Sequence, residues 1–274
     1  MTEANNPNWL RHGKKTLLGI ARASGGKAYG SKEGDHGPFW ILRGFLGIKM
    51  GVCENGELPQ EFEEGHKKLI PLIFLHGISS NRSMNTGTCR DLASHGYLVF
   101  TMDHEDGTCS YTVSEDGSKE QYYNNSMKLY DKEGRRAQLK IREAEAITLV
   151  DEIVKDNGKA MLKKLGFSEK VEIDTSRLII SGHSFGGITA INVAKNDQRI
   201  KLCATLDPWV FTYHNEISKG EYKLNLPHIV ISTAHFHPSA VKIFPSWDST
   251  KSLFKHSKDK RHENIVIKNT GHLH

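Results

Sequence analysis

The chain of 274 residues is long enough to form one α/β domain with a sizeable core. Charged residues make up 25% of it and hydrophobic residues 37%, ordinary shares that exclude a wholly disordered, collagen-like or disulfide-scaffold protein. The net charge of +5 is mild and lacks the concentrated basic stripe of a nucleic-acid binder, so we expect no nucleic-acid partner.

Cysteine usage and the apolar runs favour a reducing compartment. The cysteines Cys53, Cys89, Cys109 and Cys203 have no CxxC neighbour, which argues against a structural zinc or a disulfide framework. The first apolar run, residues 17–20, is shorter than the roughly 7–15 residues of a signal peptide. No stretch reaches the roughly 18 apolar residues of a transmembrane helix. We therefore predict a cytoplasmic protein.

Residues 1–68 are rich in glycine and are predicted to form an N-terminal extension packed on a core of residues 69–274, within a single domain. They contain one apolar segment, residues 39–52, which either packs on the core or touches a lipid surface. A basic run at residues 251–262 is typical of a solvated helix face, and attraction to an anionic lipid surface is the alternative. Weak membrane-surface association is therefore one expectation for this chain.

From residue 69 onward, short apolar runs rich in β-branched residues predict the buried strands of a parallel sheet. The runs cover residues 69–75, 97–102, 178–181, 202–206, 228–233 and 264–267. Helical patterns lie between several of them, the longest at residues 135–155, and another helix is predicted to begin at Ser184. We therefore expect a mostly parallel α/β sheet with helices on both faces. The polar residues 105–134 are predicted to form a long surface excursion at one end of this sheet.

The pentapeptide GHSFG at residues 182–186 matches the pattern GxSxG between a predicted strand and a predicted helix. A serine on such a sharp turn exposes its Oγ from a strained backbone, and its neighbours must be small to avoid clashes. The amides that open the following helix point toward developing negative charge. Ser184 is therefore the predicted nucleophile, with a plain glycine-rich turn as the alternative.

A serine nucleophile needs a base, and the base needs an orienting acid. Asp207 follows the next predicted strand and so lies at the same rim of the sheet as Ser184. Its alternative role is to start a turn or cap a helix. His272 and His274 both follow the last predicted strand, and either is positioned to serve as the base.

The tetrahedral intermediate of acyl transfer also needs hydrogen-bond donors. The backbone N–H of Phe185 directly follows the nucleophile, and a second donor is expected from the loop after an earlier strand. Ile78, which follows the dipeptide His76-Gly77, is the candidate for that position, and a plain strand-ending turn is the alternative there.

Several longer stretches resemble the platelet-activating-factor acetylhydrolases, meaning the plasma, lipoprotein-associated type and its intracellular relative, within the α/β-hydrolase superfamily. These stretches lie at residues 74–78, 91–99, 103–106, 138–153, 180–189 and 206–211. The sequences DLASHGY, from residue 91, and LDPWVF, from residue 206, are far more specific than GxSxG. The resemblance covers about residues 69–274 and implies an α/β-hydrolase fold.

Carried over by position, the resemblance implies that Ser184 is the nucleophile, Asp207 the orienting acid, and the amides of Ile78 and Phe185 the oxyanion hole. The histidine of the family lies three positions after a glycine that follows the last strand, which makes His274 the first choice and His272 the second. Members of the family continue past this histidine with a loop and a further helix. We therefore expect that the C-terminus of this chain is truncated.

The implied reaction is hydrolysis of the sn-2 ester of glycerophospholipids that carry a short or oxidised acyl chain. Platelet-activating factor would be converted to its lyso form and acetate, without calcium or any other metal and without a cofactor. Trp209 and Phe211, just after the acid, either line an acyl pocket or belong to the buried core.

Two other functions fit the same residues. A general carboxylesterase, or a polyester or dienelactone hydrolase, would use Ser184 and Asp207 on soluble esters. A non-catalytic lipid-binding pseudoenzyme would result if the segment after His274 is lost. Hydrolysis of acetyl-phospholipid, compared with p-nitrophenyl esters, separates the enzymes, and labelling by a fluorophosphonate separates both from the binding protein.

Overall fold

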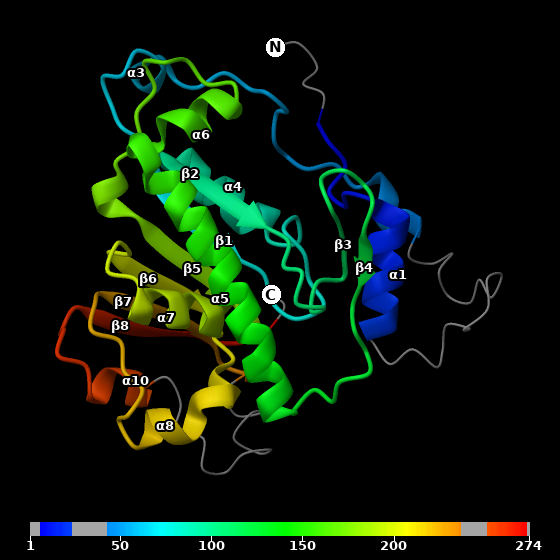
Figure 1. Cartoon of the computed structure of the whole chain (residues 1–274), viewed down its shortest axis with the longest axis vertical. Coiled ribbons are helices and arrows are strands. Elements are labelled where there is room, and N and C mark those ends of the chain that lie inside the picture. The colour runs from blue at the N-terminus through cyan, green and yellow to red at the C-terminus, as the bar shows by residue number, and fades with distance from the viewer. Residues whose placement is uncertain (1–5, 24–42, 237–250, 273–274) are drawn as a thin grey trace.

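A computed structural model describes residues 6–23, 43–236 and 251–272, and its centre is a six-stranded parallel sheet (Figure 1). The strand order is β2-β1-β5-β6-β7-β8. The strands are β1 Ile70–Leu75, β2 Tyr97–Met102, β5 Ile179–His183, β6 Leu202–Leu206, β7 His228–Thr233 and β8 His262–Ile267. All six predicted strands are therefore confirmed, and so is the mostly parallel α/β sheet.

Both faces of the central strands are buried, because alternate side chains of a strand point to opposite faces. From β1, Ile73 and Leu75 enter the main core, whereas Leu72 and Phe74 enter a smaller cluster on the other side. The edge strand β8 departs from this pattern. Its last three residues, Ile265 to Ile267, are 47%, 56% and 45% exposed, and among the described residues β8 pairs only with β7.

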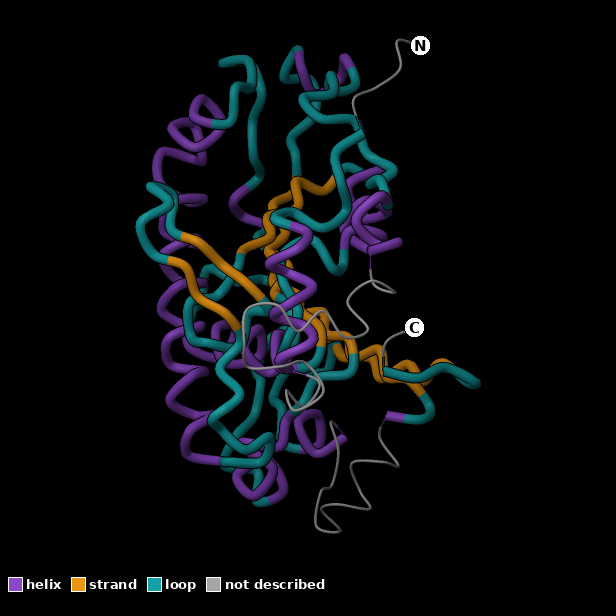
Figure 2. The backbone as a smooth tube through the Cα atoms, turned by 90° about the vertical axis from the view of Figure 1, so that its right-hand side faces the viewer, coloured by secondary structure: helices purple, strands orange, loops and turns teal. Residues whose placement is uncertain are grey.

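Helices cover both faces of the sheet, as predicted. The long α5, Lys132–Val154, and α7, Phe185–Asn196, supply the main core, whereas α4, Thr86–Ser94, packs on the opposite cluster. In the side view, the strands lie between helices on either side (Figure 2). Asp131 caps α5 by accepting a hydrogen bond from the backbone N–H of Gly134 at 3.1 Å.

The remaining elements are short. They are α1 Gly13–Ala23, η1 Arg43–Gly47, α3 Gln60–Glu63, β3 Tyr111–Val113, β4 Glu120–Tyr122, η2 Lys155–Gly158, α6 Lys159–Lys164, η3 Thr175–Arg177, η4 Val210–Tyr213, α8 His214–Ser218 and α10 Lys251–Lys255. In the parts of the chain that the structure describes, no helix has both the length and the apolar composition to cross a bilayer.

The N-terminal α1 packs against the β3–β4 hairpin. A Cβ added to Gly19 would lie 1.7 Å from the carbonyl oxygen of Ser110, so the close approach of helix and loop requires glycine there. The division into an extension and a core stays a prediction. Of the apolar segment, residues 39–42 lie outside the described ranges, while Phe45 and Ile48 are 42% and 41% exposed. Its contact with lipid also stays a prediction.

The polar stretch 105–134 differs from the surface excursion that its composition predicts. Asp106, Thr108, Cys109 and Ser110 are buried, and only the later part of the stretch lies at the surface. The buried part accommodates polar side chains because hydrogen bonds satisfy them, as between the backbone N–H of Thr108 and Asp106 Oδ1 at 3.1 Å. This segment supports the site described next.

Candidate active site

Ser184 lies on the predicted sharp turn between β5 and α7. Its backbone φ of 56° and ψ of −116° are strained for a residue with a side chain. Two backbone hydrogen bonds hold this conformation: the N–H of Ser184 donates to Leu206 at 2.9 Å, and its carbonyl accepts from the N–H of Trp209 at 2.9 Å. The turn is therefore anchored to the end of β6 and to the segment that follows it.

Two glycines let the backbone pass closely around Ser184. A Cβ on Gly182 would lie 2.3 Å from the carbonyl oxygen of Gly186, and a Cβ on Gly186 would lie 2.1 Å from that of Leu75. Any side chain at either position would displace backbone. The small residues of the GxSxG pattern are thus required by packing, as its chemistry predicts.

Asp207 follows β6 with a φ of 42°, and its carboxylate is almost completely buried. Its Oδ1 accepts a hydrogen bond from the backbone N–H of Thr233 at 2.6 Å, and its Oδ2 accepts from the Thr233 hydroxyl at 2.6 Å. The same Oδ2 lies 3.1 Å from His272 Nδ1. Three donors therefore fix the carboxylate at the end of β6.

The imidazole of His272 completes a chain of hydrogen bonds. Its Nδ1–H donates to Asp207, and its Nε2 lies 2.9 Å from Ser184 Oγ, so it can accept the hydroxyl proton. The structure thus brings together Ser184, Asp207 and the second-choice histidine. His274, the first choice, lies outside the described residues.

Two aromatic side chains flank His272, and neither was found from the sequence. The ring of Phe236 stacks on the imidazole at 3.8 Å and 10°, and the ring of His183 lies 4.5 Å away at 34°. His183 Nε2–H also donates to the carbonyl oxygen of His272 at 2.8 Å. Burial lowers the pKa of His183 to about 4, so it is neutral near pH 7. These contacts fix both the ring and the backbone of His272.

The two predicted oxyanion donors lie at the carboxyl ends of neighbouring strands, since Leu75 of β1 is in register with Gly182 of β5. The chain after β1 passes close to the nucleophile, because a Cβ on Gly77 would lie 3.1 Å from Ser184 Cβ. Phe185 is the first residue of α7, where an N–H has no acceptor within the helix. The donor roles of Ile78 and Phe185 stay predictions.

Trp209 and Phe211 both belong to the main hydrophobic core. They are 6% and 4% exposed and stack on each other at 5.3 Å. Tyr130, which is 40% exposed, meets both rings edge to face, and Phe185 lies 5.9 Å from Trp209. Their core role is thus evident, and lining of an acyl pocket stays a prediction.

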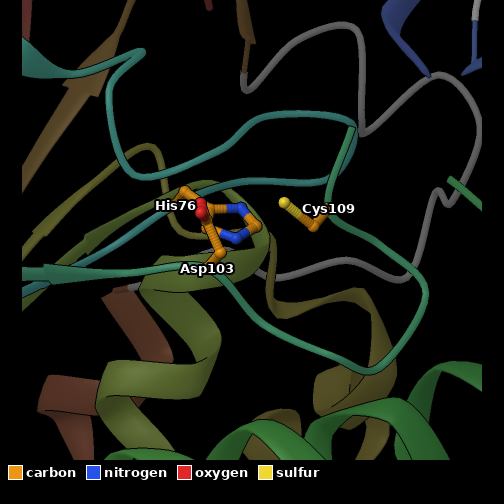
Figure 3. Close-up of side chains that lie close together, drawn as sticks. All are labelled: His76, Asp103 and Cys109. Atoms are coloured by element: carbon orange, nitrogen blue, oxygen red, sulfur yellow. The ribbon is translucent and has the colours of Figure 1, made fainter. Parts of the chain in front are cut away.

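Among the described residues, two groups of three side chains have metal-ligand atoms within 4.8 Å of one another. One group is His183, Asp207 and His272, which already form the hydrogen bonds given above. The other, His76, Asp103 and Cys109, lies beside the chain after β1 (Figure 3).

In this second group, each side chain already has a protein partner. His76 Nδ1 lies 2.7 Å from the carbonyl oxygen of Gly77, and Cys109 donates to Tyr111 at 3.2 Å. Asp103 accepts from the backbone N–H of Arg82 at 2.7 Å. Burial raises the pKa of the Cys109 thiol, which therefore stays protonated. Each of these three side chains thus forms its hydrogen bond with a residue outside the group.

The family model described as platelet-activating factor acetylhydrolase, isoform II, matches residues 45–274. The chain belongs to this family. A platelet-activating factor acetylhydrolase of Bos taurus is 30% identical over 198 residues, which cover 66% of this chain and 44% of the relative. The one of Canis lupus familiaris is 28% identical over 252 residues, covering 85% and 54%. This family member spans about half the length of the curated relatives it matches.

Solved structures share the fold of this acetylhydrolase-family chain. A ferulic acid esterase from Streptomyces cinnamoneus superposes with a TM-score of 0.60 at 17% identity, covering 98% of this chain and 62% of the esterase. TT1662 from Thermus thermophilus has a TM-score of 0.51 at 16% identity, covering 75% of this chain and 82% of TT1662. The α/β-hydrolase fold implied by the sequence is thereby confirmed.

Proposed function

We propose that this chain is a serine-dependent carboxylic ester hydrolase acting on the sn-2 ester of glycerophospholipids with a short or oxidised acyl chain. Platelet-activating factor would be converted to its lyso form and acetate. The observation that carries the proposal is the hydrogen-bonded chain from Ser184 Oγ through His272 to Asp207. Membership of the acetylhydrolase family supports a phospholipid substrate.

In the proposed reaction, Ser184 Oγ attacks the ester carbonyl while His272 Nε2 accepts its proton. Asp207 holds the imidazole in the tautomer with a proton on Nδ1 and stabilises the imidazolium. The oxyanion accepts hydrogen bonds from the N–H groups of Ile78 and Phe185. His272 then protonates the departing lysophospholipid oxygen, and water, deprotonated by His272, releases acetate from the serine. In this scheme backbone N–H groups stabilise the negative charge of the oxyanion by hydrogen bonds. We therefore propose that turnover needs no calcium.

The substrate class is tested by comparing 1-alkyl-2-acetyl-glycerophosphocholine with p-nitrophenyl acetate. We expect release of acetate from both esters and unchanged rates after treatment with EDTA. Turnover of the soluble ester without any cleavage of the phospholipid would favour a general carboxylesterase. A well-folded protein that cleaves neither ester and takes up no fluorophosphonate would favour a lipid-binding pseudoenzyme. Loss of activity in EDTA, restored by calcium, would overturn the calcium-independent mechanism.

The identity of the base is tested by comparing His272→Gln with His274→Gln. We expect the first substitution to lower kcat for p-nitrophenyl acetate by about 10³-fold or more, because Ser184 loses its proton acceptor. The second is expected to leave kcat within about threefold of the parent. The reverse pattern would assign the base to His274, the histidine implied by the family resemblance.

A further inference from the structure

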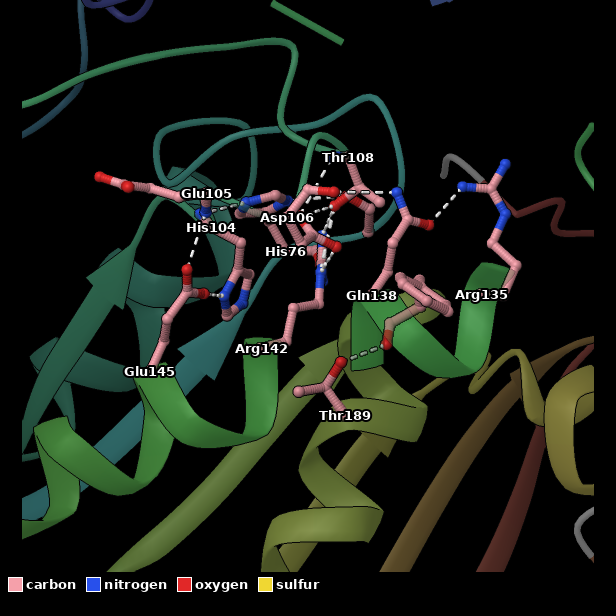
Figure 4. A network of polar contacts seen from close by, with 12 residues as sticks. His76, His104, Glu105, Asp106, Thr108, Arg135, Gln138, Arg142, Glu145 and Thr189 are labelled. Carbon is pink, nitrogen blue, oxygen red and sulfur yellow. Dashed lines mark hydrogen bonds and ion pairs between the residues drawn. The ribbon is translucent and has the colours of Figure 1, made fainter. Parts of the chain in front are cut away.

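Arg142 of α5 is a fully buried charged residue within a network of polar contacts (Figure 4). Its Nε donates to Asp106 Oδ2 at 2.9 Å, and neither side chain of this ion pair is exposed. Nε also lies 3.1 Å from Thr108 Oγ1, and Nη2 bonds the same hydroxyl. The third donor, Nη1, reaches the carbonyl oxygen of His76 at 2.8 Å.

This guanidinium contacts both segments that carry the oxyanion donors. The His76 carbonyl lies two residues before Ile78, whose N–H is one proposed donor. The guanidinium carbon also lies 4.9 Å from the ring centre of Phe185, whose N–H is the other, in a cation–π arrangement. The Arg142 side chain therefore contacts both the loop after β1 and the first residue of α7.

The partners of Arg142 are themselves held in place. Gln138 Nε2 donates to the Asp106 carbonyl at 3.0 Å, and the N–H of Ser79 donates to the Thr108 carbonyl at 2.8 Å. The N–H of Ser110 donates to Ser80 at 2.8 Å. The loop after β1 therefore rests on residues 106–110, and Arg142 joins these two segments to α5.

Stability alone gives little reason for a buried arginine at this place. Taking two charges out of water offsets most of their attraction, and apolar side chains of similar volume often stabilise a core equally well. The planar guanidinium instead fixes the relative orientation of its partners, because it donates hydrogen bonds to a carboxylate, a hydroxyl and a carbonyl at fixed angles. Donors to an oxyanion need such fixed placement, because they contribute only at hydrogen-bond distance from the developing charge.

We propose that Arg142 is a positioning residue of the oxyanion hole, fixing the loop that carries Ile78 and the ring of Phe185 relative to Ser184. This inference rests on the proposed esterase function. The guanidinium acts through geometry, because Asp106 compensates its charge. Arg142→Lys keeps the positive charge but loses the planar guanidinium with its several N–H donors. We therefore expect it to lose the positioning of the two oxyanion donors.

The test compares p-nitrophenyl acetate with its thiono analogue, whose C=S sulfur is a weak hydrogen-bond acceptor. In Arg142→Lys we expect kcat for the oxygen ester to fall by about 10- to 100-fold, less than the roughly 10²- to 10³-fold effect of removing one donor outright, because both donors remain but are displaced. KM is expected to change by less than about threefold. The ratio of oxygen-ester to thiono-ester turnover is expected to fall at least about tenfold. The control is Arg199→Lys. Arg199 forms an ion pair with Asp151, near the C-terminal end of α5, and its substitution is expected to leave the ratio of the two turnover rates unchanged.

The ratio does not depend on how much of the variant is folded, since unfolded protein lowers both rates equally. If both rates fall together at a constant ratio, Arg142 has only a structural role and the inference is overturned. If Arg142→Lys does not fold, Thr108→Val gives the same test by removing a partner of the guanidinium, with an expected three- to tenfold fall in the ratio. A parent protein inactive on both esters would instead overturn the proposed function.

Discussion

Ser184→Ala is expected to lower the turnover of acetyl-phospholipid and of p-nitrophenyl acetate by about 10⁴-fold or more, because it removes the proposed nucleophile that forms the acyl-enzyme. Labelling by a fluorophosphonate, read by intact mass, is expected to disappear with it. Ser176→Ala replaces an exposed serine of η3 and is the matched control, for which we expect parent activity and full labelling. Activity or labelling that survives in Ser184→Ala would place the nucleophile elsewhere.

Ser184→Gly separates chemistry from backbone strain at the same position. Glycine adopts the φ of 56° without steric penalty, whereas alanine retains it. Ser184→Gly is therefore expected to be as inactive as Ser184→Ala but more stable by about 1 kcal/mol. Urea denaturation of the two variants measures this difference, and equal stability would contradict the prediction.

The second large effect is a loss of stability in mild acid. Burial is the main cause that lowers the pKa of four histidines, to about 4 for His183 and about 3 for His228, and well below 6.5 for His76 and His104. Between pH 6.5 and these lowered values, the unfolded chain binds protons that the folded chain does not. The contribution of these neutral imidazoles to the free energy of unfolding is thus fully present above pH 6.5, and it is lost as the pH falls toward 4.

The size of this effect follows from the number of protons. Each proton contributes about 1.4 kcal/mol per pH unit, and His183 alone accounts for about 3 kcal/mol over its range. Burial raises the pKa of Glu143 and Glu145, and these carboxyls act in the opposite direction. Two to four net protons give an expected slope of about 3 to 6 kcal/mol per pH unit near pH 5.

Urea unfolding between pH 4.5 and 7.5 measures the slope. His228→Gln is expected to reduce the slope by about 1.4 kcal/mol per pH unit, because it removes one imidazole that is almost completely buried and lies 3.1 Å from the Thr205 hydroxyl. His66→Gln, at a side chain that is 71% exposed, is the control. A free energy of unfolding that is flat between pH 4.5 and 6.5 would contradict the prediction.

The sheet and the serine turn were predictable from sequence, because both depend on local patterns. Apolar runs of strand length predict a parallel sheet, and the GxSxG pattern lies within five residues, although the contact that requires Gly186 to be glycine comes from Leu75 of β1. The choice between His272 and His274 depends on the path of a loop, which no local pattern determines. Thr233 ends β7, next to the strand that carries Asp207, so the order of strands is needed to place it.

Arg142 was missed although a signal for it exists. The sequence of α5, the helix that carries Arg142, mixes acidic and basic residues, a composition that suggests a solvent-exposed helix. Yet Arg135 and Arg142 fall on the same helical stripe as Leu139 and Ala146, at spacings of three and four residues. Charged residues on the apolar stripe of a helix predict a buried polar network, and all four residues are fully buried.

The edge strand β8 affects how many molecules hold the proposed base in place. The proposed base follows this strand, whose final residues are about half exposed and which, in the part of the chain that the structure describes, pairs only with β7. Elements with few buried contacts open more readily than the rest of a fold. We therefore expect the proposed arrangement of Ser184, His272 and Asp207 to be lost when β8 opens locally, while the remainder of the domain can stay folded.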